Sequence, residues 1–200
     1  DAAEAGQLKA YTESFFRLFA PITDANTLSK VNEDLAAFRA HLSDAMDAGK
    51  IAADGLLAAD PEGDRAGFID NAILLFADGI ENVERGAATL LHLLARENAL
   101  GTVSDDLACL KEAFRLNTPA QVIARVAKEE MTIEGRKITA GSPVFLGLGA
   151  ANRDPAVFES PNEFRTTRHH GDVLTFGRGR HSCLGSALVV RQLLALLGAV

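Results

Sequence analysis

The chain has 200 residues, a net charge of −7 and 48% hydrophobic residues. This composition fits one globular domain, and its acidic balance gives little electrostatic support for nucleic-acid binding. No apolar run reaches the roughly 18–20 residues that cross a bilayer. For this reason we expect no membrane partner. Two cysteines, Cys109 and Cys183, do not make a disulfide framework, so we expect a reducing, cytoplasmic setting.

Apolar residues at helical spacing dominate the first half of the chain. They predict helices over residues 7–20, 26–48, 65–98 and 104–116. Asn26 or Thr27 would cap the second helix and Ser104 the fourth, and a short apolar piece (51–59) and a turn (60–64) precede the third. The third helix is apolar on all sides before Asp78, which is typical of a helix that crosses a protein interior.

The pattern changes to strands after Pro119. Residues 122–127 read as a strand, and residues 131–144 alternate as paired strands do, with turns at Glu134-Gly135 and Ala140-Gly141. A polar coil then leads to Asp172, and an apolar helix covers 186–197. Helices followed by small sheets predict an α+β fold that is predominantly helical.

The most informative segment is FGRGRHSCLG, residues 176–185, which places Cys183 between a glycine-rich loop and the last helix. Glycines let the backbone turn tightly and approach the sulfur. Free amides and the dipole of the following helix stabilise a negative charge on that sulfur. The pattern therefore suits a thiolate that faces a bound metal or electrophile. A buried structural cysteine is the alternative interpretation.

The spacing F-x-x-G-x-H-x-C-x-G resembles the haem-ligand loop of the cytochrome P450 family, the haem-thiolate oxygenases. The resemblance implies that Cys183 is the axial ligand of the iron of haem b. It also implies that Phe176 packs beside the sulfur and that His181 pairs with a haem propionate, with Gly177 and Gly185 shaping the loop.

The resemblance extends from about residue 7 to residue 197. It implies a cytochrome P450-like fold that is incomplete at the N-terminus and at the C-terminus. Residues 1–200 would then be the C-terminal portion of one longer haem domain. Because the sequence starts at Asp1 and not at Met, we also expect it to be a fragment, at least at the N-terminus.

Glu112 and Arg115 lie three residues apart in the fourth helix, so both charges share one face. A solvated ion pair is one interpretation. The other rests on the family's E-x-x-R pair, which braces the haem side of the core together with a later arginine. The resemblance assigns that arginine to Arg168 and gives the cluster a structural role.

Arg125 lies within the apolar strand VIARVA. It is either an edge residue that faces water or a buried ligand for an anion. The family has an arginine in the matching strand that binds a haem propionate through a charge-assisted fork, and the resemblance implies the same for Arg125.

The segment Asp78-Gly79-Ile80-Glu81-Asn82 resembles the family's small-Gly-x-acid-Thr pattern, in which the acid and the hydroxyl pass protons to bound oxygen. Gly79 and Glu81 match, whereas Asp78 replaces a small residue and Asn82 replaces the threonine. An amide does not relay a proton as a hydroxyl does. Either Asn82 holds a relaying water, or the chemistry is altered, or Asp78 and Asn82 simply face solvent.

Three functions remain open. The resemblance implies a haem-thiolate monooxygenase that inserts one oxygen atom from O2 into a small organic substrate, with electrons from a ferredoxin- or flavodoxin-type donor. The alternatives are a haem-binding family member with altered or lost oxygenation, acting as partner or sensor, and an unrelated binding module.

His169 and His170 lack partners at metal spacing, so we expect a surface pair. Cys109 is expected to be a packed helix residue.

Overall fold

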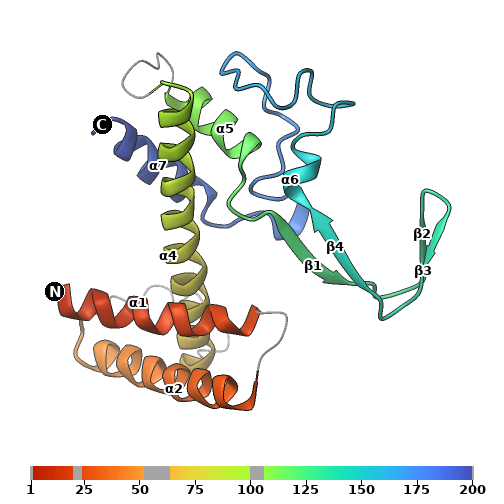
Figure 1. Ribbon diagram of the computed structural model, residues 1–200. Coiled ribbons are helices and arrows are strands. Elements are labelled where there is room, and N and C mark those ends of the chain that lie inside the picture. Colours follow the sequence, from red (N-terminus) through yellow and green to blue (C-terminus); the bar gives the residue numbers. More distant parts are fainter. Residues whose placement is uncertain (1, 20–23, 52–63, 100–105, 200) are drawn as a thin grey trace. The chain divides into compact units, whose positions relative to one another are not determined.

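The computed structural model describes residues 2–19, 24–51, 64–99 and 106–199, and they form two compact units, Asp1–Glu81 and Asn82–Val200 (Figure 1). The predicted apolar piece and turn before the third helix, and the predicted cap Ser104, lie almost entirely outside the described residues.

The first unit is helical. It contains α1 (Ala2–Phe16), the short 3-10 helix η1 (Arg17–Phe19), α2 (Ala25–Asp47) and the first half of α4 (Arg65–Arg96). Helices α1 and α2 pack together, and Tyr11 stacks on Phe38 with ring centroids 5.1 Å apart. The buried residues of this core are Phe38, Leu42, Ile69 and Ile73. The helices predicted from apolar spacing are confirmed, although α1 begins five residues earlier than expected.

The predicted cap of α2 was wrong. Asp24 occupies the cap: Oδ1 accepts a hydrogen bond of 2.9 Å from the Thr27 N–H, and Oδ2 accepts one of 2.8 Å from the Thr27 hydroxyl. A carboxylate one residue before the helix reaches the N–H three positions on, whereas Asn26 already lies inside the first turn.

Helix α4 buries one face and exposes the other. Ile69, Ile73 and Ala77, spaced by four residues, are buried. Leu74, Leu75 and Phe76 are between 39% and 58% exposed, so burial on all sides before Asp78 is not found in the described structure. The core of the first unit covers one side of the helix, which leaves Leu74, Leu75 and Phe76 exposed.

The second unit joins helices to two small sheets. Helices α5 (Asp106–Leu116) and α7 (Ser186–Leu197) pack on each other. The buried side chains of this core are Leu90, Leu93, Leu94, Cys109, Leu110, Ala113, Phe114, Leu116 and Leu193. Gly86 of α4 permits close packing, because a Cβ there would lie 3.0 Å from Phe114 Cζ. The prediction that Cys109 is a packed helix residue is confirmed.

Two antiparallel strand pairs follow α5 (Figure 1). Strand β1 (Val122–Val126) pairs with β4 (Pro143–Gly147), which places Arg125 opposite Val144. Strands β2 (Met131–Ile133) and β3 (Arg136–Ile138) form a hairpin whose turn residues, Glu134 and Gly135, both have positive φ. The one-turn helix α6 (Leu148–Ala151) follows β4. The α+β, predominantly helical fold is confirmed.

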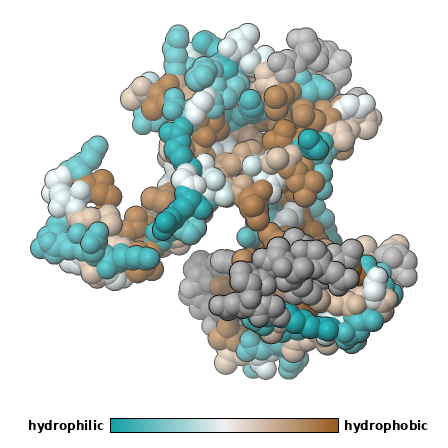
Figure 2. Space-filling view, turned by 180° about the vertical axis from the view of Figure 1, so that it is seen from behind, coloured by the Kyte–Doolittle hydropathy of each residue, from teal (hydrophilic) through white to brown (hydrophobic). Residues whose placement is uncertain are grey.

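The two kinds of surface on the second unit are visible in Figure 2, where the β2–β3 hairpin is mainly hydrophilic and the helical part carries broad apolar areas. Among the helices that the structure describes, none combines the length and apolar composition needed to cross a membrane.

Candidate functional site

The loop before α7 turns at two glycines and presents Cys183 at the surface. Gly177 (φ 67°) and Gly179 (φ 85°) adopt the left-handed conformation that favours glycine. The Cys183 N–H donates a hydrogen bond of 2.8 Å to the Phe176 carbonyl, which closes the loop. Gly185 then caps α7. Cys183 is exposed, so the interpretation as a buried structural cysteine is wrong.

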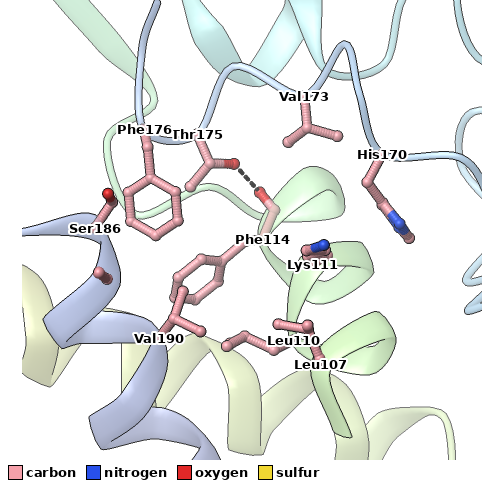
Figure 3. Close-up of a pocket in the computed structure, with 11 residues that line it drawn as sticks. Leu107, Leu110, Lys111, Phe114, His170, Val173, Thr175, Phe176, Ser186 and Val190 are labelled. Atoms are coloured by element: carbon pink, nitrogen blue, oxygen red, sulfur yellow. Dashed lines mark hydrogen bonds between the residues drawn. The ribbon is translucent and has the colours of Figure 1, made fainter. Parts of the chain in front are cut away.

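The loop is fastened to α5 by Phe176 and its neighbour. The rings of Phe176 and Phe114 meet edge to face with centroids 6.0 Å apart. The Thr175 hydroxyl donates a hydrogen bond of 2.8 Å to the Phe114 carbonyl (Figure 3). The buried Asn152 side chain accepts a 2.7 Å hydrogen bond from the Leu174 N–H. Sequence patterns gave no signal for Asn152 or Thr175, because both act through contacts distant in sequence.

Glu112, Arg115 and Arg168 lie in one hydrogen-bonded cluster. Arg115 binds both carboxylate oxygens of Glu112 at 2.8 Å, and Arg168 Nε lies 3.2 Å from Oε1. The Glu112 and Arg115 side chains are 0% exposed, so this is a buried pair and not a solvated one. Arg115 also donates to the carbonyls of Asn152, Pro161 and Glu163, which ties the coil to α5.

His170 corrects the sequence-based expectation of a surface pair. Its side chain is 8% exposed, and its Nε2 lies 3.0 Å from Glu112 Oε2. His169 is exposed, as expected. The prediction failed for His170 because its partner lies 58 residues away in sequence.

The Glu112 carboxyl group has a low pKa. Burial would raise the pKa, but hydrogen bonds from Arg115, His170 and the Arg165 N–H outweigh it and lower the pKa from 4.5 to about 2. The carboxylate therefore stays charged over the physiological range.

This pKa predicts a pH dependence of stability. A carboxyl whose pKa falls on folding contributes stability above its unfolded pKa, and that contribution is lost as the pH falls toward the folded value. With a shift from 4.5 to about 2, wild type should lose about 2 kcal/mol from this group between neutral pH and about pH 3. Urea unfolding of wild type and Glu112→Gln at both pH values checks this. An unchanged difference between the two proteins would contradict the lowered pKa.

Arg125 and His181 are exposed in this structure. Arg125 Nη1 donates 2.8 Å to the Ala124 carbonyl, and the described residues show no hydrogen bond or ion pair that joins Arg125 or His181 to Cys183 or to a carboxylate. The exposed Arg125 guanidinium and His181 imidazole can therefore both be reached by an anion.

The residues of the segment that resembles the family's proton-delivery pattern follow one another on α4. Asp78, Gly79 and Glu81 belong to the first unit, whereas Asn82 and Cys183 belong to the second. Neighbouring atoms desolvate the Asp78 carboxyl group and raise its pKa, although the residue as a whole is exposed. A Cβ at Gly79 would meet nothing within 4 Å, so the helix surface is open there.

A pocket of about 330 Å³ lies behind the loop, between α5, the coil before Phe176 and the start of α7 (Figure 3). Its lining is mainly apolar and includes Phe114, Phe176 and Val190, with His170 and Lys111 as the basic groups. It belongs to the second unit.

A family model described as Cytochrome P450 matches residues 107–200, the part that holds the Glu112 cluster and the cysteine loop. Residues 107–200 belong to the cytochrome P450 family. Curated P450 relatives include the biotin biosynthesis cytochrome P450 of Bacillus subtilis, 43% identical over 99 residues, or 50% of this chain and 24% of that relative. A putative cytochrome P450 133B2 of Xylella fastidiosa is 36% identical over 146 residues, or 69% of this chain and 37% of the relative.

Solved P450 structures extend the likeness to the rest of the chain. The complex of P450BioI with acyl carrier protein ligated to hexadec-9Z-enoic acid superposes with a TM-score of 0.86 and 27% identity, covering 99% of this chain and 55% of that one. CalO2 gives 0.87 and 25%, covering 100% and 53%. The fold is that of a P450, and the chain spans about half the length of these structures.

Proposed function

We propose that the whole protein is a haem-thiolate monooxygenase. It would insert one oxygen atom from O2 into a small organic substrate, with electrons from a ferredoxin- or flavodoxin-type donor in the cytoplasm. The observation that carries the proposal is the exposed Cys183, held by the Phe176 carbonyl in a glycine turn before α7, in a P450-family segment.

The residues of the second unit fit haem, a flat apolar group with two carboxylates. Cys183 offers a thiolate, the ligand that favours O–O cleavage. Arg125 offers an exposed guanidinium and His181 an exposed imidazole N–H for the propionates. Leu184, 84% exposed, and Phe145, 69% exposed, offer apolar contact. Bound haem supplies the oxygen chemistry, and the protein supplies position and charge.

Each residue of the site then has a task. Cys183 would hold the haem iron through its sulfur, and Phe176 fastens the loop that carries the sulfur to Phe114 of α5. Gly177 permits the turn, and Gly185 is the N-cap of α7. Glu112, Arg115 and Arg168 hold the coil that leads into this loop, as a structural brace and not as proton donors.

On α4, Gly79 gives a surface without a side chain, and Glu81 is the group proposed to deliver protons. Asp78 adds a second carboxyl group whose raised pKa favours its protonated form more than usual. Asn82 would hold a water by its amide, because an amide both donates and accepts hydrogen bonds.

Replacing Asn82 with threonine tests this assignment. If Asn82 orders the relaying water, Asn82→Thr should change the share of electrons that ends in product, by about twofold or more. The measurement is product formed per electron consumed, with Asn71→Thr, an exposed position on the same helix, as the control. Equal coupling in all three proteins would contradict a relay role for Asn82.

A second candidate, a family member with altered or lost oxygenation, is favoured by Asp78 and Asn82, which replace a small residue and a threonine. Supplying the haem-loaded protein with electrons, labelled O2 and a substrate panel separates the two. Fatty acids, free and carrier-linked, belong in the panel, because the similar P450BioI binds an acylated carrier protein. One labelled oxygen atom per product supports the monooxygenase. Oxygen consumption without any labelled product favours the second candidate.

A further inference from the structure

His170 makes a contact that the functions above do not use. Its Nε2 lies 3.0 Å from Glu112 Oε2, and because a carboxylate only accepts hydrogen bonds, this nitrogen donates. Five hydrogen bonds then converge on the Glu112 carboxylate, two from Arg115 and one each from Arg165 N–H, Arg168 and His170.

Arg168 and His170 hold the same coil at two points. Arg168 Nε binds Oε1 at 3.2 Å, and His170 Nε2 binds Oε2 at 3.0 Å. The Arg165 N–H also binds Oε1, so without His170 this coil would be attached to one carboxylate oxygen only, whereas bonds to both oxygens fix its direction. Both side chains are less than a tenth exposed, so water cannot readily replace either bond.

The coil beyond His170 leads directly into the cysteine loop. The Leu174 N–H binds Asn152, the Thr175 hydroxyl binds the Phe114 carbonyl, and the Phe176 carbonyl accepts the Cys183 N–H. His170 is thus the last residue of the coil that binds the Glu112 cluster before these three hydrogen bonds begin. It also lies at the edge of the pocket behind the loop (Figure 3).

We propose that His170 is a positioning residue for Cys183. By binding Oε2 of Glu112, its side chain fixes the position of the coil before Leu174. This position in turn sets the direction in which the loop presents the Cys183 sulfur. What Cys183 then does rests on the proposed function, but the positioning itself is testable without haem.

The test is hydrogen exchange of the backbone amides in the whole protein. His170→Leu removes the donor, His170→Gln restores an N–H at similar reach, and the same two changes at exposed His169 are the matched controls. We expect His170→Leu to speed exchange of the Leu174 and Cys183 amides about tenfold or more, with β1–β4 amides unchanged. His170→Gln and both His169 variants should stay within about twofold of wild type.

Two outcomes would overturn the proposal. One is unchanged exchange at Leu174 and Cys183 in His170→Leu. The other is equal acceleration at β1–β4, which would give His170 a general role in stability. If His170→Leu does not fold, His170→Asn makes the same comparison, because its shorter amide does not reach Glu112.

A spectroscopic measurement separates this inference from the proposed function. In the haem-loaded protein, His170→Leu should lower the fraction of the reduced carbon monoxide complex that has a thiolate-type spectrum, and His170→Gln should restore it. Wild type without any thiolate-type spectrum would sink the proposed function, while the exchange result still decides the role of His170.

Discussion

Replacing Glu112 with glutamine is expected to destabilise the fold by about 3–5 kcal/mol, the usual cost of breaking a buried ion pair. The variant leaves two guanidinium groups, those of Arg115 and Arg168, without their carboxylate. The amide also has one oxygen instead of two, so it cannot accept the same five donors. Arg115 keeps its backbone carbonyl partners, which limits the loss.

Chemical denaturation at neutral pH measures this effect. Glu163→Gln is the matched control, because Glu163 pairs with Arg165 at 2.5 Å on the surface. That exposed pair should contribute less than about 1 kcal/mol. Equal effects of the two substitutions would contradict a structural brace centred on Glu112.

Replacing Cys183 with serine is expected to weaken haem binding by at least about tenfold, since loss of even an outer partner of a metal ligand costs this much. A serine hydroxyl is not ionised near neutral pH and is a poor ligand for iron. The rest of the loop should persist, because its hydrogen bonds are made by the backbone of Phe176 and Cys183.

Haem titration of the purified protein checks this prediction. Cys109→Ala is the control, because it removes the other thiol from a fully buried position in the helical core. Unchanged haem affinity in Cys183→Ser, or an equal loss of haem affinity in Cys109→Ala, would contradict the assignment of Cys183 as the iron ligand.

Local patterns predicted the elements of this chain well. The limits of α7 agree with the sequence, and those of α2 and α4 differ by no more than two residues, because an apolar stripe and a glycine or polar stop define each helix. The turns at Gly135 and Gly177 could also be predicted from local sequence, because both positions have positive φ and glycine adopts positive φ readily.

Contacts between distant residues could not be predicted in the same way. Nothing near His170 in sequence indicates Glu112, and nothing near Asn152 indicates Leu174. Glu112 and Arg115 were recognised as a pair because they share one helix face, and Arg168 because it resembles a family position. The resemblance assigned no role to His170, so the sequence did not indicate its contact with Glu112.

Exposure was predicted least well. Leu74, Leu75 and Phe76 are as apolar as the buried Ile69 and Ile73, and composition does not say which face of a helix its neighbours cover. The same holds for Arg125, for which strand pairing leaves both a solvent-facing and an anion-binding role open.

The absorption spectrum of the reduced, carbon monoxide-bound whole protein tests the central claim most directly, because the spectrum reports the ligand opposite carbon monoxide. If the Cys183 thiolate binds the iron, wild type gives the thiolate-type red shift and Cys183→Ser loses it. A wild-type spectrum without that shift, or a shift that persists in Cys183→Ser, would contradict the assignment.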